Sequence, residues 1–437
     1  MLNINKKYII IGFLLTLLFV TTSKAQVGMI GYGRYDKFGL LGGGLGYTSI
    51  DNDSYVTITL TPELSFGKIG VGLNVLLLYN TNNGHIRSKD WDESYDYFRA
   101  IRYLRYGWKG DDLYTRIGTL DATRIGHGFI MNYYTNEANW DNRKIGLTLD
   151  SDFGRYGIET MTSNLGRSEI IGGRFYLRPF KNVLNMPLLN NVIFGATYIT
   201  DVDPDVNRAT ENDDVSVYGL DIELPFIDNK LLWTAIYADY AKINNFGSGK
   251  AVGVGLRLKG MGEFVYFEAR LERRWLGEEF LPSYFDSFYE IDRYVPLTST
   301  TGVYKTEILS GITSSLKGVF GELRSNILGI VDIIGNFQKL DAVDNSGILH
   351  INAITRRHIP LVTFQATYDK KNIGSFKDIR TLDNRSIARL GIGYKIKPFL
   401  ILFMDYIWTF ELDEESNQYI PQERYSPRLV FNYEFSM

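Results

Sequence analysis

The chain has 437 residues, contains no cysteine, and carries 47 Lys and Arg against 50 Asp and Glu, for a net charge of −3. The absence of cysteine excludes a disulfide scaffold and a thiolate metal site, and the slightly acidic balance argues against a nucleic-acid partner, which requires a clustered basic face. The 30 Tyr, 26 Phe and 43 Gly favour a chain built from two-faced strands.

The N-terminal segment has the pattern of an export signal. Two lysines precede an uncharged apolar run at 8–20, and small residues follow this run just before Gln26. A membrane anchor is the alternative, but a spanning helix needs roughly 20 apolar residues. We therefore predict a cleaved signal peptide at 1–25 and a single domain over 26–437.

The rest of the chain is dominated by segments in which apolar and polar residues alternate. Such alternation places each set of side chains on its own face of a strand. The strands that it predicts, in chain order, are 38–49, 54–66, 68–80, 98–109, 112–120, 143–152, 155–163, 169–179, 190–200, 214–224, 230–241, 250–259, 263–275, 302–314, 326–338, 347–356, 361–369, 386–397, 399–411 and 424–437. They number about 20, with 18 as an alternative, because the pattern is weak over 315–346.

The polar faces of several predicted strands carry charges of both signs. In the strand at 263–275, four residues of alternating charge share one face, opposite mainly apolar residues. A packed core does not tolerate such a face, whereas a water-filled lumen does. The predicted pore-lining residues are Glu268, Arg270, Glu272, Arg274, Arg174, Arg178, Asp221, Glu223, Arg257, Lys259, Arg389 and Lys395. The alternative is that cross-strand salt bridges fill a closed barrel.

Tight turns alternate with long connections along this strand order. The long connections are 81–97, 121–142, 201–213, 276–301, 370–385 and 412–423. Short periplasmic turns and long external loops are typical of outer-membrane barrels. The predicted fold class is therefore all-β: a single transmembrane antiparallel up-and-down β-barrel of about 18–20 strands. Few residues precede the first strand, which argues against the plug domain of a TonB-dependent transporter.

The last predicted strand continues the alternation to the final residue. Leu429, Phe431, Tyr433, Phe435 and Met437 share one face. This segment resembles the C-terminal strand of Gram-negative outer-membrane β-barrel proteins, although that strand usually ends in Phe, and the chain as a whole resembles porins. The resemblance implies recognition by the barrel-assembly machinery and a place in the outer membrane, in contact with its lipid and lipopolysaccharide. A homo-oligomer is left open.

Two functions are consistent with this resemblance. The first is a passive channel for small hydrophilic solutes, in which the lumen charges filter what diffuses through. The alternative is a barrel that does not transport and serves instead as a scaffold or component of a surface or secretion assembly.

One long connection, 121–142, is unusually rich in aromatic and aliphatic residues. A long apolar loop is expected to pack against another part of the protein rather than extend into water. It links the fifth and sixth predicted strands, the place of the constriction loop in general porins. We predict that it folds into the lumen and narrows it, with Arg124, His127 and Asn132 near the opening. Packing over the barrel mouth or between subunits is the alternative.

Patterns of metal binding and catalysis are weak in this chain. Asp201, Asp203 and Asp205 resemble the start of a calcium loop, but Val206 stands where an EF-hand needs Gly, so a solvated loop is favoured and no metal site is predicted. Only four histidines occur, and no motif of a hydrolase, a zinc protease or a phosphate-binding loop is present. His127 could serve at a rim site, but a loop histidine without a recognised partner is more often structural. We expect neither an enzyme nor a bound cofactor.

Overall fold

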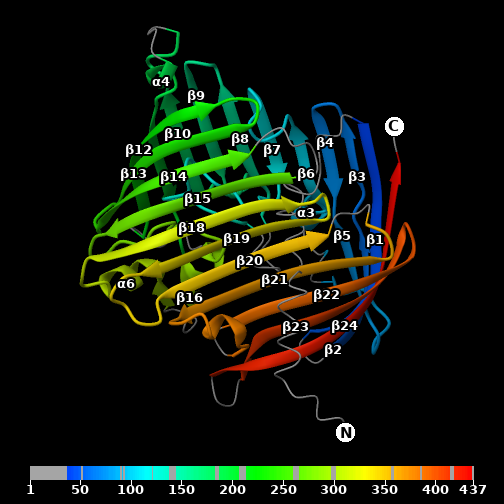
Figure 1. The fold of residues 1–437 in the computed structure, drawn as a ribbon. Coiled ribbons are helices and arrows are strands. Elements are labelled where there is room, and N and C mark those ends of the chain that lie inside the picture. The colour runs from blue at the N-terminus through cyan, green and yellow to red at the C-terminus, as the bar shows by residue number, and fades with distance from the viewer. Residues whose placement is uncertain are drawn as a thin grey trace.

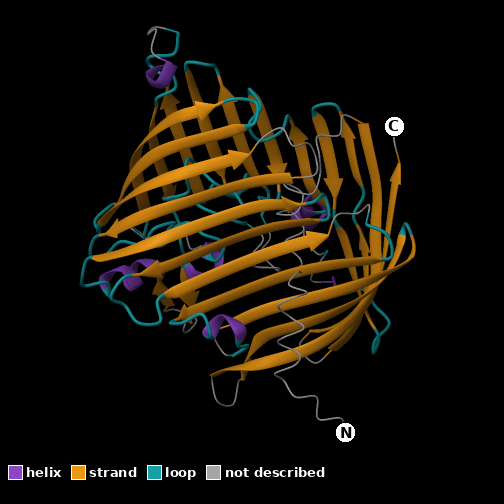
Figure 2. Cartoon of the chain, viewed as in Figure 1, coloured by secondary structure: helices purple, strands orange, loops and turns teal. Residues whose placement is uncertain are grey.

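Strands account for most of the regular structure, as Figure 2 shows. The computed structural model describes residues 37–50, 53–88, 91, 94–120, 122–136, 144–182, 187–205, 213–258, 265–296, 302–355, 359–383, 386–413 and 418–435. The predicted signal peptide lies outside these residues and stays a prediction. Within them, none of the helices combines the length and the apolar character that crossing a membrane requires.

Among the described residues, 22 strands form one sheet (Figure 1). The first half comprises β1 (Lys37–Ile50), β2 (Asp53–Leu60), β3 (Glu63–Phe66), β4 (Ile69–Leu73), β5 (Val75–Asn80), β6 (Ile101–Tyr106), β7 (Leu113–Gly118), β8 (Gly146–Asp152), β9 (Tyr156–Thr162), β10 (Ile170–Leu177), β11 (Ile193–Asp201) and β12 (Val215–Asp228). The second half comprises β13 (Leu232–Ile243), β14 (Ser248–Leu258), β15 (Val265–Leu276), β18 (Leu316–Ile327), β19 (Val331–Leu340), β20 (Gly347–Thr355), β21 (Val362–Ile373), β22 (Ser386–Lys397), β23 (Leu400–Asp413) and β24 (Gln418–Phe435).

The remaining elements lie in the connections between these strands. They are the hairpin of β16 (Tyr294–Pro296) and β17 (Gly302–Tyr304), the helices α3 (Ser94–Arg99), α4 (Pro187–Asn190), α5 (Tyr289–Asp292) and α6 (Lys305–Ser310), and the 3₁₀ turn η2 (Asp378–Arg380). The hairpin and the helices α5 and α6 all belong to the connection between β15 and β18.

The sheet closes on itself. Its strands pair antiparallel, and β1 also pairs with β24, from Gly39 opposite Phe435 to Gly46 opposite Arg428. Both β2 and β3 pair with β1, and they pair on their other side with β5 and β4, so β2 and β3 form one interrupted strand, and β4 and β5 form another. One interruption contains Pro62, which has no N–H to donate. Two interrupted strands among 22 members leave a closed barrel of 20 strands, which confirms the predicted fold class.

The predicted alternation corresponds to the two faces of the barrel wall. Along β12, Tyr218, Leu220 and Ile222 are exposed on the outside, whereas Asp221 is buried on the inside. The same alternation recurs around the sheet: exposed large apolar residues include Phe175 of β10, Val252 of β14, Leu271 of β15, Ile392 of β22 and Leu402 of β23. An apolar outer face and a polar inner face are what a bilayer-spanning barrel requires.

The predicted strand at 302–314 is wrong. Only Gly302–Tyr304 is extended, as β17, and helix α6 follows it, while the barrel strand is β18 at Leu316–Ile327. The helix begins where Glu307 accepts a hydrogen bond from the backbone N–H of Tyr304 (3.1 Å), and its Leu309 is fully buried. Capping by Glu307 and the burial of Leu309 therefore override the strand-like composition of this segment.

Five long intervals between consecutive barrel strands all follow strands that run in the same direction. They separate β5 from β6, β7 from β8, β11 from β12, β15 from β18 and β21 from β22. The opposite end has short links, such as 153–155, 229–231 and 398–399, apart from 178–192, which contains α4. This is the arrangement of outer-membrane barrels, in which the long loops face outward.

We expect the replacement of Leu220 by Arg to destabilise the barrel by about 2–4 kcal/mol, because a charge in the middle of the lipid-facing wall must leave water. Leu231→Arg provides the matched control, since Leu231 is equally exposed but lies in the turn between β12 and β13. Reversible unfolding by urea in lipid vesicles measures both variants. Equal free energies for the two would contradict a bilayer at the level of Leu220.

Candidate functional site

A long loop enters the barrel between β7 and β8. Its residues 119–136, here called the inner loop, fold back on themselves, because Thr123 and Tyr134 exchange backbone hydrogen bonds of 2.8 and 3.0 Å. At the tip, Gly126 donates its N–H to Glu159 on the inward face of β9 (2.8 Å). Gly126 has a positive φ of 56°, and a Cβ there would lie only 3.0 Å from the side chain of Arg174. The tip therefore lies directly against the wall.

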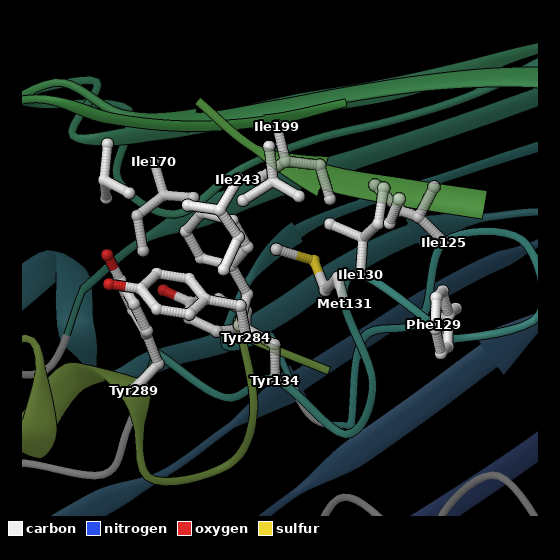
Figure 3. Close-up of a cluster of buried hydrophobic side chains, with 14 of the residues drawn as sticks. Ile125, Phe129, Ile130, Met131, Tyr134, Ile170, Ile199, Ile243, Tyr284 and Tyr289 are labelled. Atoms are coloured by element: carbon white, nitrogen blue, oxygen red, sulfur yellow. The ribbon is translucent and has the colours of Figure 1, made fainter. Parts of the chain in front are cut away.

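The apolar side of the inner loop packs against the connection 277–315, here called the cap loop. Met131 forms a β-bridge with Phe285, and Asn132 donates its N–H to the Phe285 carbonyl oxygen (3.1 Å). Figure 3 shows the cluster that they share with the wall, which includes Ile125, Phe129, Ile130, Met131, Tyr134, Ile170, Ile199, Ile243, Tyr284 and Tyr289. This packing explains why a loop of the chain is so rich in apolar residues.

His127 joins the tip of the inner loop to two further strands. Its Nδ1 lies 3.0 Å from Asp239 of β13, and its Nε2 lies 2.9 Å from Glu223 of β12. The ring stacks on Tyr237, with 4.1 Å between ring centroids. A carboxylate can only accept, so both ring nitrogens donate and the ring is an imidazolium. His127 is thus a charged anchor between the loop and the wall.

A second anchor forms around Glu322 of β18, which is almost fully buried. Arg124 of the inner loop donates to this carboxylate, and so do the Tyr133 hydroxyl (2.6 Å) and Arg270 of β15 (3.2 Å). Arg270 also donates to the carbonyl oxygen of His127. A buried carboxylate needs several such donors in place of water.

Asn132 lies next to this anchor and positions Arg124. The Nε of Arg124 donates to Asn132 Oδ1 at 2.7 Å, which orients its guanidinium towards Glu322. The three residues predicted near the opening of the lumen, Arg124, His127 and Asn132, all take part in holding the inner loop. Their role at a constriction stays a prediction.

Among the predicted pore-lining residues, cross-strand ion pairs are frequent. Arg174 donates twice to Asp221, at 2.6 and 2.8 Å, and Arg257 pairs with Glu268 at 3.0 Å. Arg174 also reaches Glu159 at 3.2 Å. These pairs join β10 to β12 and β14 to β15, so the wall charges fix the register of the strands as well as facing inward.

The predicted ladder along β15 is only partly exposed to the lumen. Glu272 and Arg274 pair at 2.6 Å, and both are buried. Glu272 also accepts from Tyr237 (2.8 Å), and Arg274 lies over the Phe129 ring of the inner loop. The middle of the ladder is therefore covered by the inner loop.

The last four predicted residues lie apart from the inner loop or outside the described structure. Arg178 pairs with Asp152 at 2.8 Å, near the end of the barrel with the short links. Arg389 lies 3.7 Å from Asp405, and Lys395 donates to the carbonyl oxygen of Ile359 (2.5 Å). Lys259 falls outside the described residues.

Several inward charges were missed by the sequence analysis. Glu322 was missed because its strand was misplaced in the weak segment 315–346. The others lie on the polar faces of strands whose positions were predicted, so applying the alternation to every strand would have found them: Glu159 of β9, Asp239 of β13, Asp405 of β23 and Arg428 of β24.

A buried network of charges joins several connections at the end of the barrel that carries the inner loop and the cap loop, and no sequence motif predicted it. Arg293 of the cap loop pairs with Glu169 at 2.6 Å and with Asp201 at 3.2 Å. Lys144 pairs with Glu169 and, at 2.6 Å, with Glu290. These five side chains come from three connections between strands and from the last residue of β11. Breaking one partner of such a buried network leaves an uncompensated charge, so these connections should behave as one rigid unit.

The acidic stretch divides between this network and a separate cluster. Asp201 binds Arg293, whereas carboxylate oxygens of Asp203, Asp205 and Asp213 lie within 4.8 Å of one another. Burial and the negative charge of Asp205 raise the pKa of Asp213 to about 6. Asp203 is buried and the other two are half-buried, and the cluster by itself does not show that an ion binds. The predicted absence of a metal site is untested and stays a prediction.

We expect the local structure around Asp213 to be less stable at a pH of about 7 than at about 5. The pKa of Asp213 is raised on folding, so its contribution to stability is present at low pH and is lost as pH rises through about 6. Hydrogen exchange around Val215, corrected for its intrinsic pH dependence, should therefore accelerate over this range. In Asp213→Asn the corrected rates should be independent of pH, and an unchanged dependence would contradict the assignment.

Comparison with known proteins finds only a weak likeness to solved structures. No protein-family model and no curated protein matches the chain. Among solved structures, CdiB from Acinetobacter baumannii is 8% identical with a TM-score of 0.30, and the match covers 91% of this chain and 60% of CdiB, so the chain spans about 60% of that protein's length. OpdL from Pseudomonas aeruginosa is 10% identical with a TM-score of 0.33, over 92% of this chain and 99% of OpdL.

A third structure is Wzi from Escherichia coli, an outer-membrane protein involved in group 1 capsule assembly and described as a carbohydrate-binding β-barrel. It is 11% identical with a TM-score of 0.36, over 96% of this chain and 90% of Wzi. At these identities and TM-scores the likenesses assign neither a family nor an activity. The closed wall of 20 strands, apolar outside and charged inside, is by itself the architecture of a membrane-spanning β-barrel.

Proposed function

We propose that the protein is a porin-like passive channel of the outer membrane, through which small hydrophilic solutes diffuse. The observation that carries this proposal is a closed barrel of 20 strands with charged side chains on its inner face. Barrels of 16–18 strands enclose an aqueous channel, so the side chains of a wall of 20 strands are too few to fill its interior. The apolar outer face matches the lipid environment that this function needs.

The inner loop supplies the constriction in this proposal. Its tip and its anchors contact β9, β12, β13, β15 and β18, which places it across one side of the wall. Arg124 keeps 16% of its side chain exposed, and it is the inner-loop charge that we place at the edge of the path. The buried part of the charge ladder then supports the loop, while partly exposed charges filter the solutes.

Reconstitution of the purified protein into a planar bilayer tests the channel. Stable stepwise currents are expected, since each inserted barrel adds one water-filled path. The matched control is the same preparation unfolded by heat before it is added. Folded protein that inserts into vesicles without any current would overturn the proposal.

A scaffold for a surface or secretion assembly is the second candidate. The buried network around Arg293 favours it, because a rigid outer surface is well suited to holding a partner. Silent bilayers, together with an envelope component that is retained on the immobilised barrel and lost with Arg293→Ala, would favour this candidate.

The proposal assigns no catalytic role to the chain. Both nitrogens of His127 face carboxylates and its ring is stacked, which leaves neither nitrogen for proton transfer to a substrate. We also propose that the barrel-assembly machinery recognises β24. The pairing of β24 with β1 supports this, because closure of the barrel must await that strand.

A further inference from the structure

The charges of the inner wall are unevenly distributed, and Glu322 marks one positive region. Three guanidinium groups surround its single carboxylate: Arg124 of the inner loop, Arg270 at 3.2 Å and Arg324 at 3.5 Å. The carboxylate lies beneath them, with 1% of its side chain exposed against 22% for Arg324. Water in the lumen therefore meets arginine at this position rather than glutamate.

A second positive region lies on the strands that close the barrel. Asp405 of β23 is 1% exposed and pairs with Arg428 of β24 at 2.5 Å and with Arg389 of β22 at 3.7 Å. Both arginines keep more than a fifth of their side chains exposed. Here one buried carboxylate supports two guanidinium groups, so the two regions together hold five arginines around two buried acids. Arg270 also lies 3.5 Å from Glu272, which pairs more closely with Arg274.

Arg428 is held in a fixed orientation. Its guanidinium carbon lies 4.4 Å from the centre of the Phe403 ring, and it also donates to Gln365 at 3.2 Å. A guanidinium stacked on an aromatic ring keeps its plane, and Nε and Nη2 of Arg428 already donate to Asp405 and Gln365, so its Nη1 group can donate to an oxyanion at little cost in conformational entropy.

The acidic side of the wall is occupied by protein groups. Arg174 donates to Asp221, and Glu159 accepts a hydrogen bond from the tip of the inner loop. His127 lies between the carboxyl groups of Glu223 and Asp239. The inner loop thus contacts these four carboxylates or their partners, and it leaves the arginines of β22 and β24 partly exposed. Partly exposed arginines on a lumen wall attract anions.

We propose that the lumen favours small anionic solutes, and that Arg389 and Arg428 form a subsite for an oxyanion, the chemistry that carboxylates and phosphates share. This inference rests on the proposed channel function. It follows from the excess of arginine at the exposed wall and from the fixed orientation of Arg428.

The zero-current potential across a bilayer with a gradient of potassium chloride tests the preference. The wild type should be more permeable to chloride than to potassium, and Arg389→Gln with Arg428→Gln should lower this ratio about threefold, the effect of about one kT in local potential. Arg389→Lys with Arg428→Lys should keep it, since charge is retained. Arg273→Gln is the matched control, because Arg273 pairs with Asp341 on the outer face.

The oxyanion subsite is tested by adding acetate or inorganic phosphate to the chloride solution. If acetate or phosphate reduces the chloride current, and reduces it less in the glutamine variant, the subsite is supported. The solute that reduces the current shows whether a carboxylate or a phosphate binds. Channels without a preference for chloride, or with currents that neither oxyanion reduces, would overturn this inference while leaving the channel intact. Silent bilayers would instead overturn the channel itself.

Discussion

Replacing residues 124–133 with the two-residue turn Asn-Gly is expected to raise the single-channel conductance at least about twofold, because the narrowest section of a water-filled path sets its resistance. The replacement fits the structure, since Thr123 and Tyr134 already pair as neighbouring strands do and a two-residue turn can join them. The barrel wall itself is untouched. Conductance in planar bilayers measures the change.

A shortened loop elsewhere at the same end provides the control. Replacing residues 341–345 with the same turn removes the connection between β19 and β20, which is exposed for the most part. Its conductance should equal that of the wild type. If removal of the inner-loop tip also leaves the conductance unchanged, the inner loop does not form the constriction.

Glu322→Gln is expected to lower the free energy of unfolding by about 3–5 kcal/mol, the cost of breaking a buried charge network from one side. Glutamine keeps the shape of the side chain but leaves the positive charges of Arg124 and Arg270 without their carboxylate. The inner loop should also detach more readily, since Arg124 is one of its anchors. Urea unfolding in vesicles measures the first effect, and the frequency of large conductance steps measures the second.

Asp341→Asn is the matched control for the same chemistry at the surface. Asp341 pairs with Arg273, but both side chains are exposed, so water and salt screen the interaction. Its unfolding should match that of the wild type. If both variants lost a similar amount of unfolding free energy, the burial of Glu322 in the wall would not explain its effect on stability.

The strand pattern was predictable where each strand has one lipid face and one inner face. In β12, Leu220 faces outward and Asp221 faces inward, and the residues on either side continue this alternation. The local sequence is therefore enough to predict which face each side chain lies on. The interruption at Pro62 and the helix α6 were not predicted. The alternation of apolar and polar residues continues through both segments, although neither forms a continuous strand in the structure.

The candidate site was predictable only in part. The apolar composition of the inner loop indicated that it packs, but nothing local indicates that Phe285 is its partner. The inward charges of β10 and β15 followed from alternation, whereas Glu322 was lost when its strand was placed at the wrong position. Because one strand was predicted at the wrong position, the residue at the centre of the second anchor, Glu322, was not predicted.

The sequence by itself determined the two-faced strands and, through their number, a wide closed barrel, because alternation is a local property of the chain and a bilayer imposes it on each strand. Only the tertiary structure decided which charges meet. His127 lies between Asp239 and Glu223, which are 112 and 96 residues away in the chain. Such contacts exist only after the wall has closed and the loop has folded inward, so no local pattern encodes them.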